Sequence, residues 1–543
     1  RVYSSEMLTA LPTYHLITRQ EDIMQCHAYN QSEQIGTGEN AAWTTARRKY
    51  NWWGTLVYDG RVYDHVKYRL RGGLQRYNKN GKRSLKIRFN SGDLLQARDI
   101  FGDPYPEPWR TLELGKMHGG RGDHNWGLSE QVNMELFRLY GVPSPFAHWS
   151  HLRVIDGEAE QENQYEGDFW GLYWTAEYYD VRYLRAHELP LGNLYKLTPW
   201  ISDPLLQMRY HAPGAVYDGS DYRNYLQGMF QAQTEEWLRE HNDFDYWYRY
   251  HAITDVIKHW DLLPGTDSFS TKNMAWYFHP VPGHPYGKAW ILPYDTDASW
   301  GPNYNEGIDP AMFAIYRAAN HTQLQLEYRN HLREVRDLLF TPEVINVMIE
   351  EYASVIRDFV EADIDRWKYH PQRAMGDLPT LQWKIDDMRR FAWEGGSWNG
   401  GTVPAGGQAA LVDQLANAGG DATSIPDTPT ITYVGPDGFP INGLRFQSSP
   451  FSDPQGANTF AAMQWRVGEI DPDTVYDPDS WVQTLVPAGS TWRYRKGTSA
   501  PSQPLSAWRQ LAFNDAGWSQ GQAPIGYGET FIATTLSDMR NNY

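Results

Sequence analysis

The chain has almost no cysteine, no long apolar run and no excess of positive charge. Cys26 is the single cysteine among 543 residues, so a disulfide within the chain and a metal cluster held by several thiolates are both excluded. No apolar run approaches the roughly 18 residues that a membrane-spanning helix needs. The 49 Lys and Arg residues are outnumbered by 66 Asp and Glu residues, so we do not expect the basic surface that binds nucleic acid.

Aromatic residues, by contrast, are abundant. They make up 15% of the chain, with 24 Trp and 36 Tyr, which is typical of a globular protein with an aromatic-rich interior or aromatic ligand surfaces. A length of 543 residues exceeds what one hydrophobic core usually serves, so several domains are expected. The chain starts without an initiator Met or a signal-peptide pattern, and we expect a mature product or an excised fragment.

Strand-like and then helical patterns fill the first part of the chain. From residue 12 to about residue 90, short β-rich runs alternate with turn signals and predict an antiparallel sheet. The stretch "SEQVNMELFRLYGVP" predicts a helix with Ser129 as its N-cap and Gly141 as its stop. Further helical patterns continue to residue 394. Residues 395–424 are rich in Gly and Ala, which is the composition of a linker or flexible insert.

The stretch "ILPYDTDASWG" carries the clearest chemical signal. An apolar run, typical of a buried strand, leads into Asp295 and Asp297, and two carboxylates at a strand end can hold a hard cation such as Mg²⁺. The alternative is a turn with solvated acids, because Asp is common at turns. The segments "KNMAWYFHP" and "GKAWILPYD" predict a hairpin, which would bring Asn273 beside the aspartate pair, with Asp261 shortly before it.

This order of parts, together with six sequence segments, resembles the CotH family of atypical, protein-kinase-like enzymes. The matching segments are "YRLRGG" with "KRSLKIRF", "MELFRLYGVPSP", "GDFWGLYWTAEYYD", "GNLYKL", "KHWD" with "KNMAWYF", and "ILPYDTDASWG". The resemblance implies an α+β, two-lobed, kinase-like domain over residues 1–394, with a small β-rich lobe and a larger, mostly helical lobe. It also implies Mg²⁺-dependent transfer of the γ-phosphoryl group of ATP to a Ser or Thr hydroxyl of an acceptor protein outside the cytoplasm.

The rest of the chain is turn-rich and β-like. We expect residues 425–475 to form an incomplete β-rich module of fibronectin or immunoglobulin type. Residues 476–543 resemble the start of a β-sandwich module that follows such domains in large secreted bacterial proteins, and we expect this module to be truncated.

Several features depart from a typical protein kinase. Asp261 and Asn273 are 12 positions apart, whereas the catalytic loop of typical kinases has four residues between its Asp and its Asn. A G-x-G-x-x-G loop is lacking, and Gly72 and Gly73 are the nearest glycines that could let backbone N–H groups approach a phosphate. The motif "DTD" stands where a kinase has Asp-Phe-Gly.

The resemblance and the chemistry of phosphoryl transfer assign the catalytic roles. Lys86 alternates with apolar positions in "SLKIRF" and is the candidate for binding the phosphates, although a solvated strand lysine is the alternative. Glu135 is expected to pair with Lys86, with Glu130 as its competitor. Asp295 is the expected main metal ligand. Asp261 would orient or deprotonate the acceptor hydroxyl, and its rival for that role is Asp267.

The remaining binding residues follow from the same resemblance. Asn273 and Asp297 are the further metal ligands, for Mg²⁺ or alternatively Mn²⁺ or Ca²⁺. Glu177 lies in an aromatic segment that, by this resemblance, joins the two lobes and is where an adenine would stack. The alternative is that this segment is a core strand with aromatic packing. Lys196 is a further nucleotide-binding residue, and it or Arg71 takes the phosphate role if Lys86 points elsewhere.

Two other functions remain open. The kinase fold could be retained without turnover, either as a pseudokinase or as a structural or adhesion module that binds proteins or glycans. A glycoside hydrolase with a carboxylate pair is the third hypothesis, which requires the two carboxyl groups to be about 5 Å or about 6.5–9.5 Å apart.

Overall fold

The N-terminal strands, in which apolar and charged side chains alternate, form part of a closed barrel. The structure is a computed structural model, and it describes residues 11–28, 51–71, 82–117, 126–157, 168–196, 204–259 apart from 230 and 232, 273–301, 321–368, 379–398, 401–421, 425–460 apart from 439, and shorter stretches between 462 and 538. In the longest barrel strand, Val66, Tyr68 and Leu70 are buried, whereas the residues between them lie on the outer face.

Seven strands close this barrel in the order β1-β2-β3-β4-β5-β7-β6. Their bounds are β1 Thr13–Ile17, β2 Trp52–Tyr58, β3 Arg61–Leu70, β4 Leu85–Arg88, β5 Thr111–Gly115, β6 Ala147–Ile155 and β7 Phe169–Ala176. All neighbours are antiparallel except β1 and β6, which run parallel and close the ring. The strands predicted at 12–90 are therefore present, but the sheet they join is a closed barrel with later strands, because β1 pairs with β6.

A second sheet and the helices form a separate hydrophobic core. The sheet has the order β11-β10-β8-β9, with bounds β8 Leu194–Lys196, β9 Met208–Tyr210, β10 Met274–His279 and β11 Lys288–Pro293. The predicted hairpin is confirmed, since β10 and β11 are antiparallel with Met274 opposite Pro293. Helix α9 (Phe244–Ile257) is held to β11 by Trp247, whose Nε1 donates to the Ala289 carbonyl at 2.8 Å.

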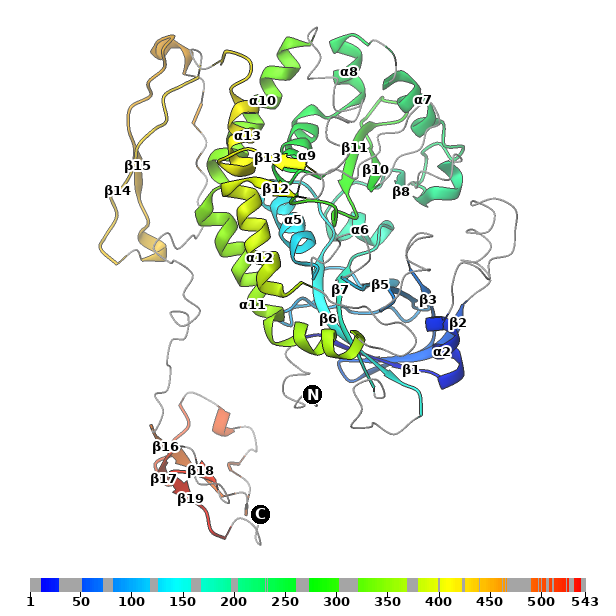
Figure 1. Cartoon of the computed structure of the whole chain (residues 1–543), viewed down its shortest axis with the longest axis vertical. Helices are drawn as coiled ribbons and strands as arrows, with labels where there is room; N and C mark the ends of the chain where they lie inside the picture. The colour runs from blue at the N-terminus through cyan, green and yellow to red at the C-terminus, as the bar shows by residue number, and fades with distance from the viewer. Residues whose placement is uncertain are drawn as a thin grey trace. The chain divides into compact units, whose positions relative to one another are not determined.

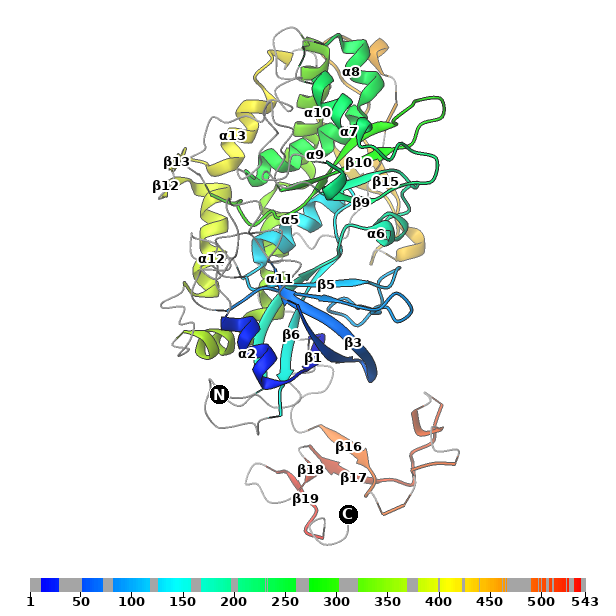
Figure 2. The same cartoon turned by 90° about the vertical axis from the view of Figure 1, so that its right-hand side faces the viewer.

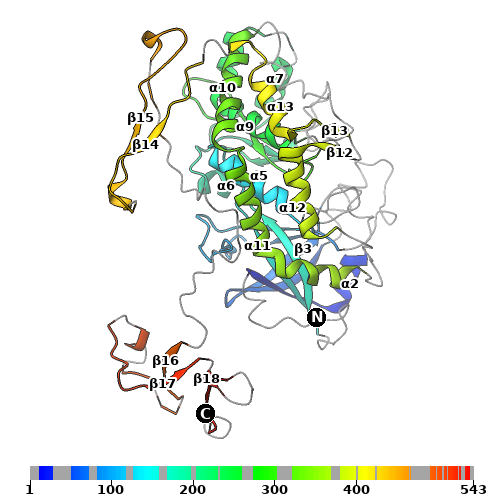
Figure 3. The same cartoon turned by 60° about the vertical axis from the view of Figure 1, so that its left-hand side comes forward.

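The described helices surround this second sheet and extend to the barrel (Figures 1 and 2). Besides α9 they are α2 Gln20–Ala28, α5 Leu128–Leu139, α6 Val181–Ala186, α7 Ser220–Met229, α8 Glu235–His241, α10 Thr322–Leu338, α11 Pro342–Trp367, α12 Leu381–Arg389 and α13 Gly407–Ala416. Shorter 3-10 and π segments lie at Pro204–Gln207 and Arg390–Glu394. Figure 3 shows α11 running past α5 and α12 toward the barrel, where it contacts β7. The expected α+β class is confirmed.

The start of α5 differs from its prediction. Gly127 is the N-cap, with φ of 72°, and Ser129 is buried within the first turn. A Cβ at position 127 would lie 2.9 Å from the Trp174 side chain, so the chain can enter the helix here only with glycine. The predicted stop at Gly141 is confirmed, with φ of 79°.

The Gly/Ala-rich segment 395–424 is not a linker, which corrects the sequence prediction. It contains the hairpin β12 (Gly396–Trp398) and β13 (Gly401–Val403), followed by α13, whose Val412 and Ala416 are fully buried. The Gln408 side chain donates to the Asp255 carbonyl of α9 at 2.7 Å. Small residues are needed here for close packing: a Cβ on Gly407 would lie 2.4 Å from the Ala392 carbonyl oxygen.

Beyond this segment the described residues have little core of their own. Between 425 and 460 the elements are β14 Ile431–Tyr433, η5 Ile441–Gly443, β15 Phe446–Ser448 and η6 Ala457–Thr459. β14 and β15 form a two-stranded sheet, and none of the described residues in this range is buried. The described residues of this range contain only this one sheet, so the fibronectin- or immunoglobulin-like module, which needs two packed sheets, stays a prediction.

The last compact unit comprises residues Asp471–Tyr543, and Arg1–Ile470 form the other. The described elements of the last unit are β16 Thr491–Tyr494, η7 Ala507–Arg509, β17 Ser519–Gln522, β18 Ile525–Gly526 and β19 Thr534–Thr535. They make one antiparallel and one parallel strand pair. A β-sandwich in this unit stays a prediction. Along the described parts of the whole chain, no helix combines the length and apolarity that crossing a membrane requires.

Two buried histidines of β6 make the barrel sensitive to acid. His148 bonds through Nε2 to the Tyr14 hydroxyl at 3.1 Å and through Nδ1 to the Tyr105 hydroxyl at 3.0 Å. The His151 ring packs edge-on against Phe359, and neither of its nitrogens has a hydrogen-bond partner. Burial lowers the pKa of His148 to about 3 and that of His151 to about 4, the latter against the opposing effect of Asp363.

We therefore expect His151→Leu to make the protein less sensitive to acid. The folded-state pKa of His151 lies below its unfolded value of about 6.5, so between about pH 6.5 and pH 4 the unfolded chain binds more protons and stability falls as the pH falls. Removing the imidazole should reduce this loss by about 1 kcal/mol per pH unit, measured by urea unfolding at a series of pH values. The exposed His65, replaced by Asn, is the control. An unchanged slope in His151→Leu would contradict this account.

Candidate active site

The outer face of β3, β4 and β5 carries a buried ion cluster centred on Glu113. Lys86 of β4 lies directly opposite Glu113 of β5. The Lys86 Nζ is 2.5 Å from one carboxylate oxygen of Glu113, and the Nε of Arg71 is 2.9 Å from the other. Burial alone would raise the pKa of Glu113, but Arg71, Lys86 and Lys196 together hold it well below its usual value. Glu113 is therefore an ionised anchor that orients two cations.

The second sheet and the turn after it add further cations and the Tyr294 ring to this cluster, and the segment after β7 adds the Tyr178 ring. The Nζ of Lys196, at the end of β8, lies 3.3 Å from the centre of the Tyr294 ring. The Tyr294 hydroxyl accepts a hydrogen bond from Arg71 at 2.9 Å, so this tyrosine joins the barrel to the second sheet. Tyr178 has the Lys86 Nζ 4.3 Å from its ring centre and the Arg209 guanidinium carbon at 5.7 Å.

Positive charge exceeds negative charge within this cluster. Burial lowers the pKa of Lys196 well below its usual value, and it also lowers the pKa of Lys86, although Glu113 opposes both shifts. Burial alone would raise the pKa of Tyr178, but Lys86 and Arg209 lower it overall. Among the described residues, cationic side chains therefore outnumber carboxylates, since Arg69 acts on this cluster as well as Arg71, Lys86, Lys196 and Arg209. An anionic ligand would balance this excess.

Asp295 lies in the turn that follows β11, next to the cluster. Burial alone would lower the pKa of Arg71, but Glu113, Tyr294 and Asp295 raise it well above its usual value. Asp295 also opposes the lowering of the pKa of Lys196. Because Met274 is opposite Pro293, Asn273 and the residues after Pro293 come from the same end of the hairpin. Both Asn273 and Asp295 have left-handed backbones, with φ of 60° and 54°, a conformation that Asn and Asp adopt more readily than other non-glycine residues.

Helix α5 holds this turn in place through Asn133. Its Nδ2 donates to the Thr296 carbonyl at 3.0 Å and to the Ser299 hydroxyl at 2.9 Å, and its Oδ1 accepts from the Trp300 indole at 2.7 Å. Asn133 and Trp300 are both buried, so these hydrogen bonds are shielded from water. Buried hydrogen bonds therefore hold the part of the turn that directly follows Asp295 against α5.

The aspartate turn fits a cation only together with other ligands. Within the described residues, no group of three or more His, Cys, Asp and Glu side chains is arranged to hold a metal ion. Asp295 and Asp297 on one turn, with Asn273 beside it, offer the oxygen ligands that Mg²⁺ prefers. Mg²⁺ is usually held by one or two carboxylates plus substrate phosphates and water, so this set fits a metal that binds with a phosphorylated substrate.

The expected pairing of Lys86 with Glu135 is wrong. Glu135 is on α5 and forms a bidentate pair with Arg138 of the same helix, while Lys86 pairs with Glu113. The partner of Lys86 is therefore a strand residue and not the helical glutamate that the kinase comparison predicted. The sequence did contain a signal, since Glu113 is the only acid in the buried strand "TLELG", where a charge needs a partner.

Glu177 supports the fold around the cluster. Its Oε2 is 2.9 Å from the His187 Nε2 and 3.3 Å from the Phe146 backbone nitrogen. This carboxylate therefore links β6 to the segment after β7, which favours the core-strand interpretation for its side chain. The neighbouring Tyr178 is the residue of the aromatic segment that reaches the cluster. Gly72, Gly73 and Asp261 lie outside the described residues.

The fold and the site together define a mixed α+β protein in which a cluster of basic side chains around Glu113 lies next to an aspartate turn. Residues 68–391, more than half of the chain, match the family described as CotH kinase protein, and the chain belongs to this family. The matched range contains the whole cluster from Arg71 to Asp295. A comparison with curated proteins finds no match.

Proposed function

We propose that this protein transfers the γ-phosphoryl group of ATP to a Ser or Thr hydroxyl of a protein. The observation that carries the proposal is the convergence of Arg71, Lys86 and Lys196 around Glu113, with Asp295 near enough to affect two of these cations. Membership of a family described as kinase protein supports the same reaction. In this proposal the barrel is the small lobe of a kinase-like domain, and the second sheet with its helices is the large lobe.

The ion cluster would bind and orient the phosphates. Phosphoryl transfer depends on positioning and charge neutralisation, and the protein supplies little covalent chemistry. Glu113 fixes the Lys86 ammonium, as a helix glutamate does for the strand lysine of protein kinases. Lys196 and Arg209 would balance further phosphate charge. The low pKa of Glu113 argues only against a general-acid role for this carboxylate in a glycosidase, because that role needs a carboxyl group that stays protonated.

The aspartate turn would hold the metal ion. Asp295, with Asn273 and Asp297, would be the protein ligands of Mg²⁺, and Mn²⁺ or Ca²⁺ are alternatives. When bound, the ion would neutralise negative charge on the phosphate oxygens. Asn133 would keep the carboxylate of Asp295 in position through the buried hydrogen bonds of the turn.

The acceptor side of the reaction is assigned to Asp261. The acceptor hydroxyl oxygen would bond to the γ-phosphorus, the bond from that phosphorus to the β-γ bridging oxygen would break, and ADP would leave. The hydroxyl proton would pass to Asp261, whose position in the sequence corresponds to the kinase catalytic aspartate. We infer from the family that the acceptor protein is outside the cytoplasm.

Binding of ATP with Mg²⁺ tests this proposal first. Because a ligand stabilises the folded state that binds it, ATP at about 100 times its Kd should raise the unfolding free energy by about 2.7 kcal/mol, seen as a higher Tm. Lys86→Met should reduce this shift strongly. Lys67→Met is the matched control. It removes a cation from the outer face of the neighbouring strand β3 without touching Glu113, so it should keep the full shift in Tm.

The outcomes separate the candidate functions. A shift in Tm together with phosphate transfer to a protein supports the kinase. A shift without transfer indicates a pseudokinase. If no shift occurs with Mg²⁺, Mn²⁺ or Ca²⁺, the proposal is wrong, and a structural or adhesion role becomes the better explanation.

A further inference from the structure

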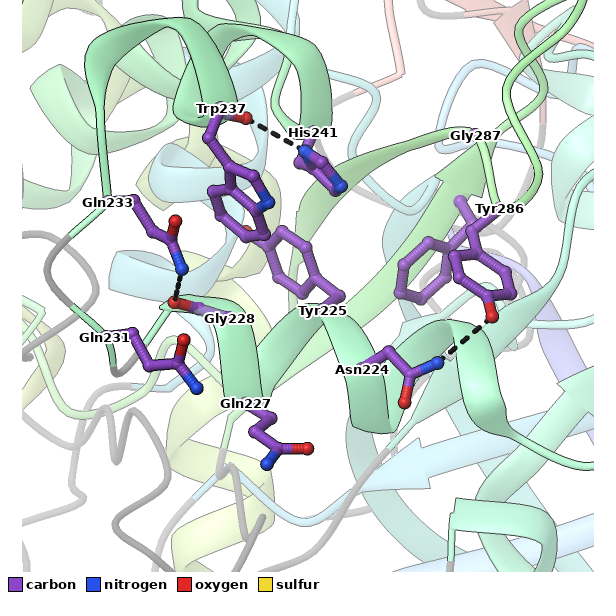
Figure 4. Close-up of a pocket in the computed structure, with 11 residues that line it drawn as sticks. Asn224, Tyr225, Gln227, Gly228, Gln231, Gln233, Trp237, His241, Tyr286 and Gly287 are labelled. Atoms are coloured by element: carbon purple, nitrogen blue, oxygen red, sulfur yellow. Dashed lines mark hydrogen bonds between the residues drawn. The ribbon is translucent and has the colours of Figure 1, made fainter.

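A pocket of about 330 Å³ lies between α7, α8 and the β10–β11 turn. Figure 4 shows Asn224, Gln227, Gln233, Trp237 and Tyr286 among the side chains around it. The volume is within the range of small-molecule binding sites. The pocket shares no residue with the cluster around Glu113, so it is a separate candidate site.

The indole of Trp237 is a rigid wall of this pocket. It stacks on His241 with ring centres 4.0 Å apart and planes 15° apart, and His241 Nδ1 is 2.9 Å from the Trp237 carbonyl oxygen. On the opposite helix, a Cβ on Gly228 would lie 2.4 Å from Trp237 Cζ2. Glycine at 228 therefore allows the indole to approach α7, and the indole needs no reorganisation to receive a ligand.

Side-chain amides supply the polar groups of the pocket. Gln233 donates to the Gly228 carbonyl at 2.9 Å, and Asn224 donates to the Tyr286 hydroxyl at 3.0 Å (Figure 4). These bonds use the NH₂ groups and orient the two residues. Gln227 and Gln231 are exposed, and neither carboxamide makes a hydrogen bond to another described residue. Each amide offers both a donor and an acceptor to a ligand.

The pocket has no formal charge to offer a ligand. None of its eleven lining residues is an Asp, Glu, Lys or Arg, although these types make up 21% of the chain. A charged ligand would lose hydration here without gaining an ionic partner. An entirely apolar ligand would leave the carboxamides desolvated and unpaired. The lining is therefore suited to a neutral ligand with one apolar face and a hydrogen-bonding edge.

We propose that this pocket binds a neutral saccharide. The C–H face of a pyranose ring is apolar and can lie against the Trp237 indole, and its hydroxyl groups can both donate to and accept from the carboxamides. A nucleotide fits less well, because its phosphates would find no cation in the pocket. Saccharide binding at this site does not depend on phosphate transfer, so a negative result for one proposal does not affect the other.

Titration of the full chain with uncharged disaccharides tests the proposal. The probes are cellobiose, maltose, mannobiose and N,N′-diacetylchitobiose, with binding followed by calorimetry and by saturation-transfer NMR. At least one should bind, and Gln227→Ala and Gln231→Ala should each weaken it several-fold without changing Tm, because both side chains are exposed. Gly228→Ala should weaken it at least tenfold, since the added methyl group displaces Trp237.

Controls distinguish this pocket from a general aromatic surface. Trp53→Ala removes a tryptophan that is 57% exposed on β2 and should leave saccharide affinity unchanged. The proposal is overturned if none of the probes binds at its solubility limit, if binding persists unchanged in Gly228→Ala, or if only adenosine, added as a further arm, binds.

Discussion

Asp295→Asn should abolish measurable phosphate transfer, a loss of at least about 10²–10³-fold, while the protein stays folded. The substitution removes one negative charge from the turn that faces Arg71 and Lys196, so the affinity for a divalent cation falls. Folding should be retained because the backbone at this position has a φ of 54°, which Asn tolerates as well as Asp does. Transfer of labelled phosphate, Mg·ATP affinity and Tm are the three measurements.

Asp261→Asn is the matched comparison for this result. A base on the acceptor side is needed only during transfer, so this variant should lose rate but keep its affinity for ATP and Mg²⁺. If Asp295→Asn instead unfolds the protein and leaves ATP affinity unchanged in the folded fraction, Asp295 is a structural turn residue. The same affinity loss in both variants would show that the two roles have been assigned incorrectly.

Asp363→Asn should destabilise the protein by about 3–5 kcal/mol. The Asp363 carboxylate accepts from Lys82 Nζ at 2.6 Å and from the Leu172 backbone nitrogen at 2.9 Å, and both charged side chains are fully buried. Burial lowers the pKa of Lys82 to about 8, although Asp363 opposes this shift, so the lysine depends on its partner. Without that partner, the amine must either stay charged or give up its proton in the interior between α11 and the barrel, and both cost stability. Urea unfolding at neutral pH measures the effect.

A double-mutant cycle measures the interaction energy between Lys82 and Asp363 separately from the contacts that each makes with other residues. Lys82→Met combined with Asp363→Leu should recover much of the lost stability, because an apolar pair carries no desolvation penalty. Glu21→Gln at the exposed pair with Arg19 is the control and should change the unfolding free energy by less than about 1 kcal/mol. A loss in Asp363→Asn no larger than in this control would mean that the buried pair does not hold α11 to the barrel.

The local elements were largely predictable from the sequence. The hairpin formed by β10 and β11 and the stop of α5 at Gly141 both follow from short-range patterns of apolar residues and turn formers. The match to the CotH family was also predictable, because its segments lie in order along the chain. The cap of α5 was not, because the choice of Gly127 depends on Trp174, which is distant in sequence.

The pairing of charges in the candidate site depended on tertiary structure. Lys86, Lys196 and Asp295 were named from the sequence because the resemblance to the CotH family and the chemistry of phosphoryl transfer pointed to them. Which carboxylate Lys86 contacts is decided by the register of β4 against β5, and that register selects Glu113 over Glu135. Strand register is a long-range property that single-strand periodicity does not specify.

By itself, the sequence determined the α+β class and the family, and it named Arg71, Lys86, Lys196 and Asp295 among the residues of the candidate site. Tertiary structure decided that β1 closes a barrel with β6 and that residues 395–424 pack against the helices. It also placed Trp237 and the amide side chains around one pocket. The physical reason is the same in each case: composition and periodicity report which side chains prefer burial or exposure. The partner that buries or neutralises each of them is set by contacts between segments far apart in the chain.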